Sequence, residues 1–258
     1  MRVEVAAAED LPGLVADRIA AALQEAVAAR GRATLAVSGG RTPGAMLRAL
    51  ADADVPWAQV HVLQVDERVA PAGDAARNLT GLTTALLDRV PLPAGNVCAI
   101  PVEWSDATAG GTDPARGPVD PDLAARRYAA DLRVLAGEPP VLDVVQLGLG
   151  DDGHTASLIP GDPVVEVTDR TVASTGDYQG HRRVTLTRPV LDAARLQVWL
   201  ATGADKASAV ARLVADDPAL VASRVRRDAA VLHLDPAAAA ALPGPDGKID
   251  ATPRRRHS

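Results

Sequence analysis

The sequence contains no phenylalanine, and aromatic residues make up only 2% of its 258 residues. Few side chains are therefore available to stack on nucleobases, which disfavours that mode of nucleic-acid binding. The hydrophobic core has to be built from Ala, Val, Leu and Ile instead. Because 47% of the residues are hydrophobic, a chain of this length can bury a sizeable core, and we expect a single domain.

Three further absences bear on where the protein acts. Cys98 is the only cysteine, which excludes an intrachain disulfide framework. No apolar run approaches the roughly 20 residues that span a bilayer, and residues 1–13 have neither a signal-peptide nor a transit-peptide pattern. The net charge of -6 gives no electrostatic reason to expect nucleic acid or an anionic membrane as a partner. We therefore expect a cytoplasmic protein in which any anion-binding site is local.

The sequence does contain a regular alternation of short Val- and Leu-rich runs with longer Ala-rich stretches of helical period. This alternation is typical of β-α-β units and predicts an α/β fold with a mostly parallel sheet flanked by helices. The predicted strands are 34–37, 60–65, 97–100, 142–147, 171–174, 183–187, 196–201 and 229–234. The predicted helices are 11–27, 43–53, 78–87, 123–136 and 204–215.

Two segments lack this alternation. Residues 103–121 are rich in Gly, Pro, Asp and Thr, and they predict a surface loop inside the domain. Residues 243–258 combine Pro, Gly and basic residues, and they predict a disordered C-terminal tail. We therefore expect one domain over residues 1–242.

A small-residue segment, Ser38–Pro43, lies between a predicted strand and a predicted helix. Small residues allow the backbone to approach an anion closely, and the N-terminus of the following helix directs free N–H groups at it. Pro43 suits the first turn of that helix. The segment is a candidate phosphate cradle, although an ordinary β-α turn explains the same residues equally well.

Three charged residues, Asp66, Glu67 and Arg68, stand together directly after the predicted strand at 60–65. The carboxyl ends of strands are where an α/β sheet presents residues to its ligand. Charges so close to a buried strand need partners or water. Two interpretations remain open: a ligand-binding group, or a structural salt bridge between Arg68 and one of the two acids.

The segment Gly148–Thr155, with the sequence GLGDDGHT, follows another predicted strand. Its three glycines match the Gly-x-Gly-x-x-Gly pattern of dinucleotide-binding proteins. Its two acidic residues, however, place negative charge where a pyrophosphate would lie. Pro160 also cuts short the helix that should follow, and the segment lies in the middle of the chain. We therefore disfavour a nucleotide-binding function.

The same segment presents His154, and imidazole is the usual side chain for moving a proton near neutral pH. Either Asp151 or Asp152 could orient the ring. The competing structural interpretation is a histidine that merely caps a helix. We do not expect a metal site, because the five histidines, at positions 61, 154, 181, 233 and 257, show no ligand spacing.

A set of basic residues lies in the C-terminal third of the chain. Arg182, Arg183 and Arg188 surround the predicted strand at 183–187, and Lys206 stands where the strand at 196–201 passes into a helix. Cations at strand and helix ends suit a phosphate dianion. Taken singly, each such residue is more often a solvated surface charge.

In their order and spacing, these segments resemble the 6-phosphogluconolactonase family, which shares its fold with the glucosamine-6-phosphate deaminases. The matching segments extend over most of the chain: 35–43, 66–69 with Asn78, 148–158, 183–187 and 202–206. The resemblance implies a doubly wound, modified Rossmann α/β fold. It also implies hydrolysis of 6-phospho-D-glucono-1,5-lactone in the oxidative pentose phosphate pathway, without a metal or an organic cofactor.

The resemblance also implies roles for individual residues. The histidine at position 154 would activate water for attack on the lactone carbonyl, and Arg68 would assist electrostatically or position the substrate. The implied catalytic residues are His154, Arg68 and Asp66. The implied substrate-binding residues are Ser38, Gly39, Gly40, Arg41, Thr42, Asn78, Gly150, Asp152, Gly153, Arg183 and Lys206. The expected partner is the sugar-phosphate substrate alone, bound by a monomer or a homodimer.

Two alternatives to the lactonase are open. The deaminases typically have Tyr at the position of Arg68, and an Asn-Glu-Pro run after the histidine whose Glu assists ring opening. Residues 156–160 read Ala-Ser-Leu-Ile-Pro and hold no carboxylate, which disfavours an amino-sugar-phosphate isomerase or deaminase. A non-catalytic sugar-phosphate sensor would normally carry a helix-turn-helix segment, and this sequence shows none.

Three positions depart from the family pattern. Arg41 stands where Ser is common, Arg77-Asn78-Leu79 replaces a Ser-Asn-Tyr run, and Gln64 is polar where an apolar or aromatic residue is common. We expect the substitutions at Arg41 and Arg77 to touch the sugar pocket.

Overall fold

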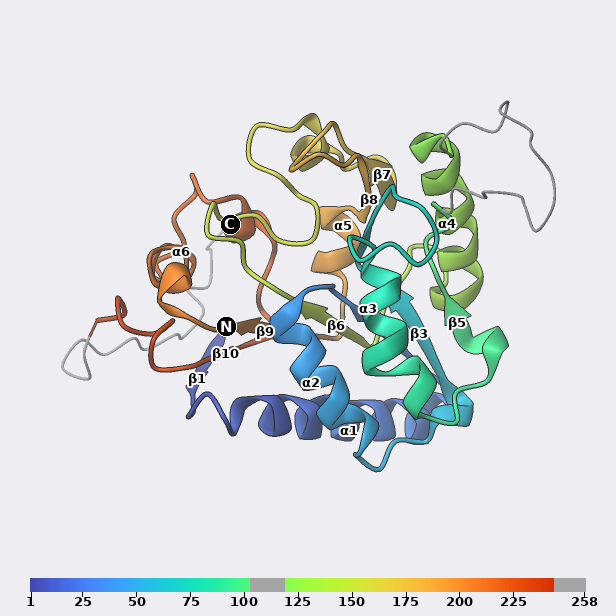
Figure 1. Ribbon diagram of the computed structural model, residues 1–258, viewed down its shortest axis with the longest axis horizontal. Coiled ribbons are helices and arrows are strands. Elements are labelled where there is room, and N and C mark those ends of the chain that lie inside the picture. The colour runs from blue at the N-terminus through green and yellow to red at the C-terminus, as the bar shows by residue number, and fades with distance from the viewer. Residues whose placement is uncertain (103–118, 244–258) are drawn as a thin grey trace, which may run out of the picture.

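A computed structural model describes residues 1–102 and 119–243 (Figure 1). The strands are β1 (Arg2–Val5), β2 (Ala33–Val37), β3 (Val60–Gln64), β4 (Asp66–Arg68), β5 (Val97–Cys98), β6 (Val144–Leu147), β7 (Val172–Ser174), β8 (Arg183–Leu186), β9 (Leu196–Ala201) and β10 (Ala230–Leu234). The α-helices are α1 (Leu11–Arg30), α2 (Arg41–Ala51), α3 (Asn78–Ala85), α4 (Pro121–Ala136), α5 (Arg188–Asp192) and α6 (Ala207–Val214). The predicted loop at 103–121 and the predicted tail at 243–258 lie almost entirely outside the described residues.

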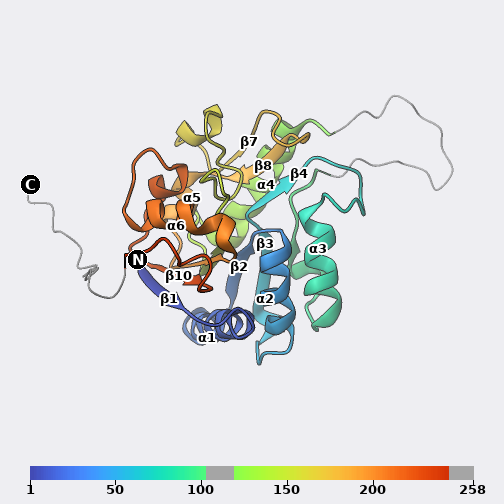
Figure 2. The same ribbon diagram turned by 60° about the vertical axis from the view of Figure 1, so that its left-hand side comes forward.

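The main sheet has the strand order β1-β10-β9-β6-β2-β3-β5, and all its neighbouring strands pair in parallel. Its inner strands are buried on both faces, which is why they read as continuous apolar runs in the sequence. Helices α1, α2 and α3 pack on one face, whereas α4, α5 and α6 pack on the other (Figure 2). The prediction of a mostly parallel, doubly wound α/β sheet is confirmed.

Residues of β2 show how the two layers share the sheet. Leu35 and Val37 pack in the core with α1 and α2, whereas Ala36 packs in the core with α4. This alternation follows from the two-residue period of a strand. Helix α1, which crosses beneath the sheet in Figure 1, ends at Gly31, whose φ of 75° lets its N–H reach the carbonyl of Val27.

A second, three-stranded sheet with the order β4-β8-β7 is antiparallel throughout. The predicted strands at 171–174 and 183–187 form part of this sheet and not of the main one. Strand β4 was missing from the predictions because its three residues are all charged. Its pairing places Asp66 opposite Thr185 and Arg68 opposite Arg183. Strand β1 and helix α5 were also missing, since both are short.

The main sheet reverses its winding between β2 and β6, which are neighbours although most of the chain between them lies elsewhere. Crevices at such switch points, beyond the carboxyl ends of the strands, are where α/β sheets bind ligands. Strands β9, β6, β2 and β3 are consecutive in the sheet, so the segments that follow them converge there. Within the described part of the chain, no helix combines the length and apolarity that crossing a membrane requires.

A buried histidine makes the stability of this fold depend on pH. His233 on β10 lies opposite Glu4 of β1, with 3.5 Å between its Nδ1 and the carboxylate, and its side chain is only 2% exposed. Burial lowers the pKa of His233 to about 4, although Glu4 opposes the shift. Below about pH 6.5, the imidazole of His233 therefore binds a proton in the unfolded chain, whereas in the folded protein it stays neutral until the pH approaches 4. The stabilisation is complete above about pH 6.5 and is lost as the pH falls toward 4.

We expect the free energy of unfolding to fall by about 2.5 kcal/mol through this group between pH 7 and pH 4.5. Urea unfolding of the wild type and of His233→Gln at both pH values measures it. The variant should lose that share of the pH dependence, because glutamine does not titrate. An identical pH dependence in the two proteins would refute the assignment.

Candidate functional site

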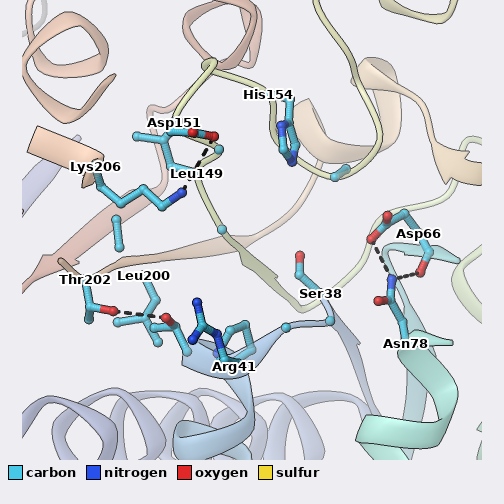
Figure 3. A pocket seen from close by; sticks show the side chains of 18 of the residues that line it. Ser38, Arg41, Asp66, Asn78, Leu149, Asp151, His154, Leu200, Thr202 and Lys206 are labelled. Atoms are coloured by element: carbon cyan, nitrogen blue, oxygen red, sulfur yellow. Dashed lines mark hydrogen bonds and ion pairs between the residues drawn. The ribbon is translucent and has the colours of Figure 1, made fainter. Parts of the chain in front are cut away.

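A cavity of about 700 Å³ opens at the carboxyl ends of β2, β3, β6 and β9 (Figure 3). Twelve of the fourteen predicted site residues line it: His154, Arg68, Asp66, Ser38, Gly39, Gly40, Arg41, Thr42, Asn78, Gly150, Arg183 and Lys206. The other two, Asp152 and Gly153, are not among the described residues that line the cavity. The structure therefore brings together, in one place, segments that are distant in the sequence.

The segment after β2 forms one wall of the cavity. Ser38 is buried, and its hydroxyl donates to the carbonyl of Gln146 on β6 at 3.0 Å. Gly39 is required there because a Cβ would overlap the side chain of Asn78. Thr42 contacts Thr202 at the end of β9, with 3.0 Å between the hydroxyl oxygens. The candidate phosphate cradle is thus fixed against three neighbouring elements.

Asp66 is buried beside the cavity and is held from two sides. The hydroxyl of Ser157 donates to Asp66 Oδ2 at 2.6 Å, and the amide of Asn78 donates to the Asp66 backbone carbonyl at 2.9 Å. Burial raises the pKa of Asp66, in opposition to the Ser157 hydrogen bond and to the charges of Arg183 and Arg68. Sequence reasoning did not single out Ser157, because its partner lies 91 residues away.

The next acid, Glu67, has a structural role: it links β4 to α3 through an ion pair and several hydrogen bonds. Its carboxylate is fully buried and forms an ion pair with Arg77 at 3.0 Å. It also accepts the backbone N–H groups of Arg68 at 2.7 Å and of Asn78 at 2.7 Å, and the amide of Gln64 at 2.9 Å. Gln64 is polar because it completes this network. These contacts hold β4 against the start of α3.

The structure contradicts one of the two interpretations of these charges and the expectation about Arg77. A structural salt bridge was considered between Arg68 and one of the acids, but the partner of Glu67 is Arg77. Arg68 instead donates to the carbonyl of Ala76 at 3.0 Å and lines the cavity. Arg77 is only 3% exposed and is not among the described residues that line the cavity, so it does not touch the pocket. Arg41 does line the cavity.

The loop after β6 places His154 at the cavity and fixes its ring (Figure 3). The ring Nδ1 lies 2.6 Å from Asp152 Oδ1, and the same oxygen accepts the backbone N–H of His154 at 3.1 Å. Asp152 is therefore the acid that orients His154. Asp151 instead approaches Lys206, with 4.0 Å between the charged atoms. A Cβ at Gly150 would overlap both the His154 ring and the Asp152 carboxylate, which explains this glycine.

Gly153, the last glycine of the segment, fixes the loop to a neighbouring part of the chain. Gly153 has a φ of 86°, and a Cβ there would overlap the side chain of Leu220. Its carbonyl accepts the N–H of Ala222 at 3.0 Å. Gly153 thus anchors the loop to the segment before β10.

Arg183 and Lys206 bring positive charge to the cavity. Arg183 reaches it because β8 pairs with β4, and its guanidinium carbon lies 5.0 Å from the centroid of the Tyr178 ring. Lys206 forms an ion pair with Asp205 at 3.3 Å. The described residues that line the cavity do not include Arg182 or Arg188.

Several residues of the site were not found by sequence reasoning. Tyr178 donates to Asp152 Oδ2 at 2.7 Å, and Gln179 lines the cavity. Both belong to a turn between β7 and β8, in which Gln179 and Gly180 have positive φ. The sequence signal for this turn is a glycine between two strands about ten residues apart, but nothing in it shows which way the side chains point.

The parallel sheet and the cavity at its switch point define a doubly wound α/β protein with a polar, cation-lined site around an oriented histidine. The family described as "Glucosamine-6-phosphate isomerases/6-phosphogluconolactonase" matches residues 6–234. The chain belongs to this family, which confirms the resemblance seen in the sequence.

Individual relatives agree with this assignment. The chain is 35% identical to a 6-phosphogluconolactonase of Nostoc sp. over 251 residues, which cover 93% of this chain and 98% of the relative. It is 38% identical to a 6-phosphogluconolactonase of Mycobacterium tuberculosis over 237 residues, which cover 88% and 92%.

Solved structures show the same fold. A 6-phosphogluconolactonase from Trypanosoma cruzi superposes with a TM-score of 0.79 at 26% identity, covering 93% of this chain and 96% of that one. A monomeric glucosamine-6-phosphate deaminase superposes with a TM-score of 0.73 at 17% identity, covering 93% of this chain and 100% of that one. The second likeness concerns the fold alone.

Proposed function

We propose that the protein is a 6-phosphogluconolactonase, which hydrolyses 6-phospho-D-glucono-1,5-lactone to 6-phospho-D-gluconate in the oxidative pentose phosphate pathway. The observation that carries this proposal is the pair formed by Asp152 and His154 at a cavity that Arg68, Arg183 and Lys206 also line. Such a cavity offers a base that can accept a proton from water. It also offers cations that can bind a phosphate group and stabilise the negative charge that develops on the lactone carbonyl oxygen.

The chemistry follows from the contact between the ring and Asp152. When the Nδ1–H of the neutral ring donates a hydrogen bond to Asp152 Oδ1, the proton stays on Nδ1. Nε2 then carries a lone pair and can accept a proton from water. The water oxygen then bonds to the lactone carbonyl carbon, and negative charge develops on the carbonyl oxygen. As the tetrahedral intermediate collapses, the ring C–O bond breaks, and the imidazolium returns its proton to the departing oxygen. The product is the open-chain carboxylic acid, which releases its remaining acidic proton to solvent and becomes the carboxylate.

Arg68 supplies a fixed positive charge for the developing oxyanion, the kind of interaction that contributes most when donors are already in place. It is held by its hydrogen bond to Ala76 and by the pairing of β4 with β8. Asp66, buried between hydrogen bonds from Ser157 and Asn78, positions this strand and balances the charges of Arg183 and Arg68.

The phosphate would bind to the segment after β2, together with Arg183 and Lys206, as the family resemblance implies. Ser38, Gly39 and Gly40 line the same cavity as these two cations. Arg41 and Thr42 extend the wall, and Gly150 lies under the His154 ring. An anchored phosphate would position the lactone carbonyl at His154, which lowers the entropic barrier of the reaction.

Replacing Lys206 by alanine should mainly weaken substrate binding. We expect KM for the lactone to rise about ten- to hundredfold, the worth of a hydrogen bond to a charged group, while kcat changes less than threefold. Lys206→Arg is the matched control, because it keeps the charge. Initial rates at varied substrate concentration separate the two constants, and a large loss of kcat with KM preserved would contradict an anchoring role.

The deaminase alternative lacks support in the site. The residues that follow His154 include no acid before Asp162, and Leu158 and Ile159 are buried. No carboxylate therefore stands where the deaminases have the Glu that assists ring opening. A non-catalytic sensor does not need an oriented base, so the contact between His154 and Asp152 at the cavity favours an enzyme over a sensor.

The test of this function is the opening of freshly generated 6-phospho-D-glucono-1,5-lactone by the full chain, corrected for spontaneous hydrolysis. The unphosphorylated glucono-1,5-lactone is the matched substrate. We expect a rate well above the spontaneous one for the first and a much smaller kcat/KM for the second. A rate no higher than the spontaneous one would overturn the proposal.

We also propose a domain organisation, a location in the cell and an oligomeric state for the enzyme. Residues 1–242 would form one α/β domain that acts in the cytoplasm as a monomer or homodimer, with its sugar-phosphate substrate as ligand and without nucleic acid or membrane. Gel filtration with light scattering would decide between the two oligomeric states.

A further inference from the structure

Tyr178 occupies a position that the proposed mechanism does not yet use. It begins a tight turn, in which its backbone N–H donates to the carbonyl of His181 at 3.0 Å and the N–H of His181 donates back at 3.2 Å. The two residues between them, Gln179 and Gly180, have φ values of 53° and 81°, as in a type I′ hairpin turn. This turn joins the extensions of β7 and β8, so the position of Tyr178 is fixed by the small sheet.

The phenol of Tyr178 completes the hydrogen bonding of Asp152. Oδ1 of Asp152 faces Nδ1 of His154 at 2.6 Å, and Oδ2 accepts the Tyr178 hydroxyl at 2.7 Å. The rings of His154 and Tyr178 meet edge to face, with 5.5 Å between their centroids. Both carboxylate oxygens are thereby occupied, and the carboxylate cannot rotate without breaking one of the two bonds.

We propose that Tyr178 is a positioning residue for the reaction: it fixes Asp152, and through Asp152 it fixes the orientation and the ring proton of His154. This inference rests on the proposed function. Tyr178 acts through another residue, and its hydroxyl has no part in the covalent steps.

The electrostatic surroundings suit this role. Burial, together with the charge of Asp152, raises the pKa of Tyr178 to about 12, so the phenol remains a donor at any pH at which the enzyme would work. The hydrogen bonds from His154 and Tyr178 outweigh burial and hold the pKa of Asp152 below its ordinary value, so its carboxylate stays an acceptor. The other charges acting on the phenol are those of Arg183 and Asp151.

The Tyr178 ring has a second contact, which the test has to keep intact. The guanidinium of Arg183 lies over it at 5.0 Å, and cations attract the faces of aromatic rings. Tyr178→Phe removes the hydroxyl and keeps the ring, whereas Tyr178→Leu removes both. The phenylalanine variant therefore removes the 2.7 Å bond to Asp152, together with the longer contacts of the hydroxyl to His154 Nδ1 at 3.5 Å and to Gln179 at 3.4 Å, and keeps the ring.

We expect Tyr178→Phe to lower kcat about tenfold and to change KM less than twofold, since one hydrogen bond to a charged group is lost and the cation contacts remain. Tyr178→Leu should in addition raise KM. The matched control is Asp177→Asn, an exposed neighbour in the same segment, which should leave both constants unchanged. Equal melting temperatures would exclude a folding defect in any of these variants.

A double-mutant cycle tests whether Tyr178 acts through Asp152. In an Asp152→Asn background, Tyr178→Phe should cause little further loss, because the group it positions is already gone. Additive losses in the double variant, or an unchanged kcat in Tyr178→Phe alone, would overturn the inference.

A readout without turnover separates this inference from the proposed function. The Nδ1 proton of His154 can be followed by NMR and assigned by its loss in His154→Gln. In Tyr178→Phe it should change its chemical shift and exchange faster with water; the same shift and exchange rate in both proteins would refute the positioning role. If the wild type fails to open the lactone while this proton responds to Tyr178→Phe, the function is wrong and the positioning stands.

Discussion

Replacement of His154 by alanine lowers kcat for the lactone by a factor on the order of 10² to 10⁴, the usual contribution of a positioned general base. The loss falls on kcat because the imidazole removes a proton from water only as the carbonyl is attacked. KM changes little, since the cations that would bind the phosphate belong to other segments, Arg183 to β8 and Lys206 to the turn before α6. Steady-state rates with the spontaneous hydrolysis subtracted measure the effect.

The control for this variant is a histidine outside the cavity. His61 stands near the amino end of β3, whereas the site lies at the carboxyl ends of the strands. His61→Ala should keep kcat within about twofold of the wild type, apart from any effect on stability. A His154→Ala enzyme that retains more than a third of the wild-type kcat would remove His154 from the role of base.

The substitution Glu67→Gln destabilises the protein by about 3 to 5 kcal/mol, because it leaves the buried charge of Arg77 without its partner. The amide also has only one acceptor oxygen, whereas the carboxylate accepts several N–H groups with two. Urea unfolding at pH 7 measures the change. A loss below about 1 kcal/mol would show that this ion pair does not hold β4 in place.

The double variant Glu67→Gln/Arg77→Met separates the two causes of that loss. Removing the arginine as well eliminates the uncompensated charge and keeps an unbranched side chain of similar reach, so part of the stability should return. What is not recovered measures the hydrogen bonds that Glu67 accepts from the chain. A double variant less stable than Glu67→Gln would contradict this division.

Much of the main sheet could be predicted from the sequence. Strands β2, β6 and β9 are buried on both faces, so each appears as a local apolar run, and the helices between them show their own period. The site segments could be placed because residues that follow parallel strands meet at one edge. Ser38, His154 and Lys206 were found in this way.

What could not be predicted depends on pairing between distant segments. Strand β4 has no apolar pattern, and only its antiparallel pairing with β8 brings Arg183 to Arg68. The sequence could not decide between Asp151 and Asp152, because the direction of a side chain in a Gly-rich loop is set by packing. The partnership of Glu67 with Arg77 was hidden for a similar reason, since Arg68 is closer in the sequence.

Among the site residues discussed, Tyr178 had the weakest signal in the sequence. It lies 26 residues from Asp152, in a segment between two short strands that belong to the second sheet. A turn glycine marks the hairpin, but the contact itself follows only from the way this sheet is placed against the loop after β6.

The most direct test of the account offers the full chain two substrates at the same enzyme concentration. One is freshly generated 6-phospho-D-glucono-1,5-lactone, with acid formation followed over the spontaneous rate, and the other is glucosamine 6-phosphate, with ammonia release followed. We predict rapid hydrolysis of the lactone, with kcat lowered on the order of 10²- to 10⁴-fold in His154→Ala, and no ammonia. Ammonia release, or lactone opening no faster than in the absence of protein, would contradict the account.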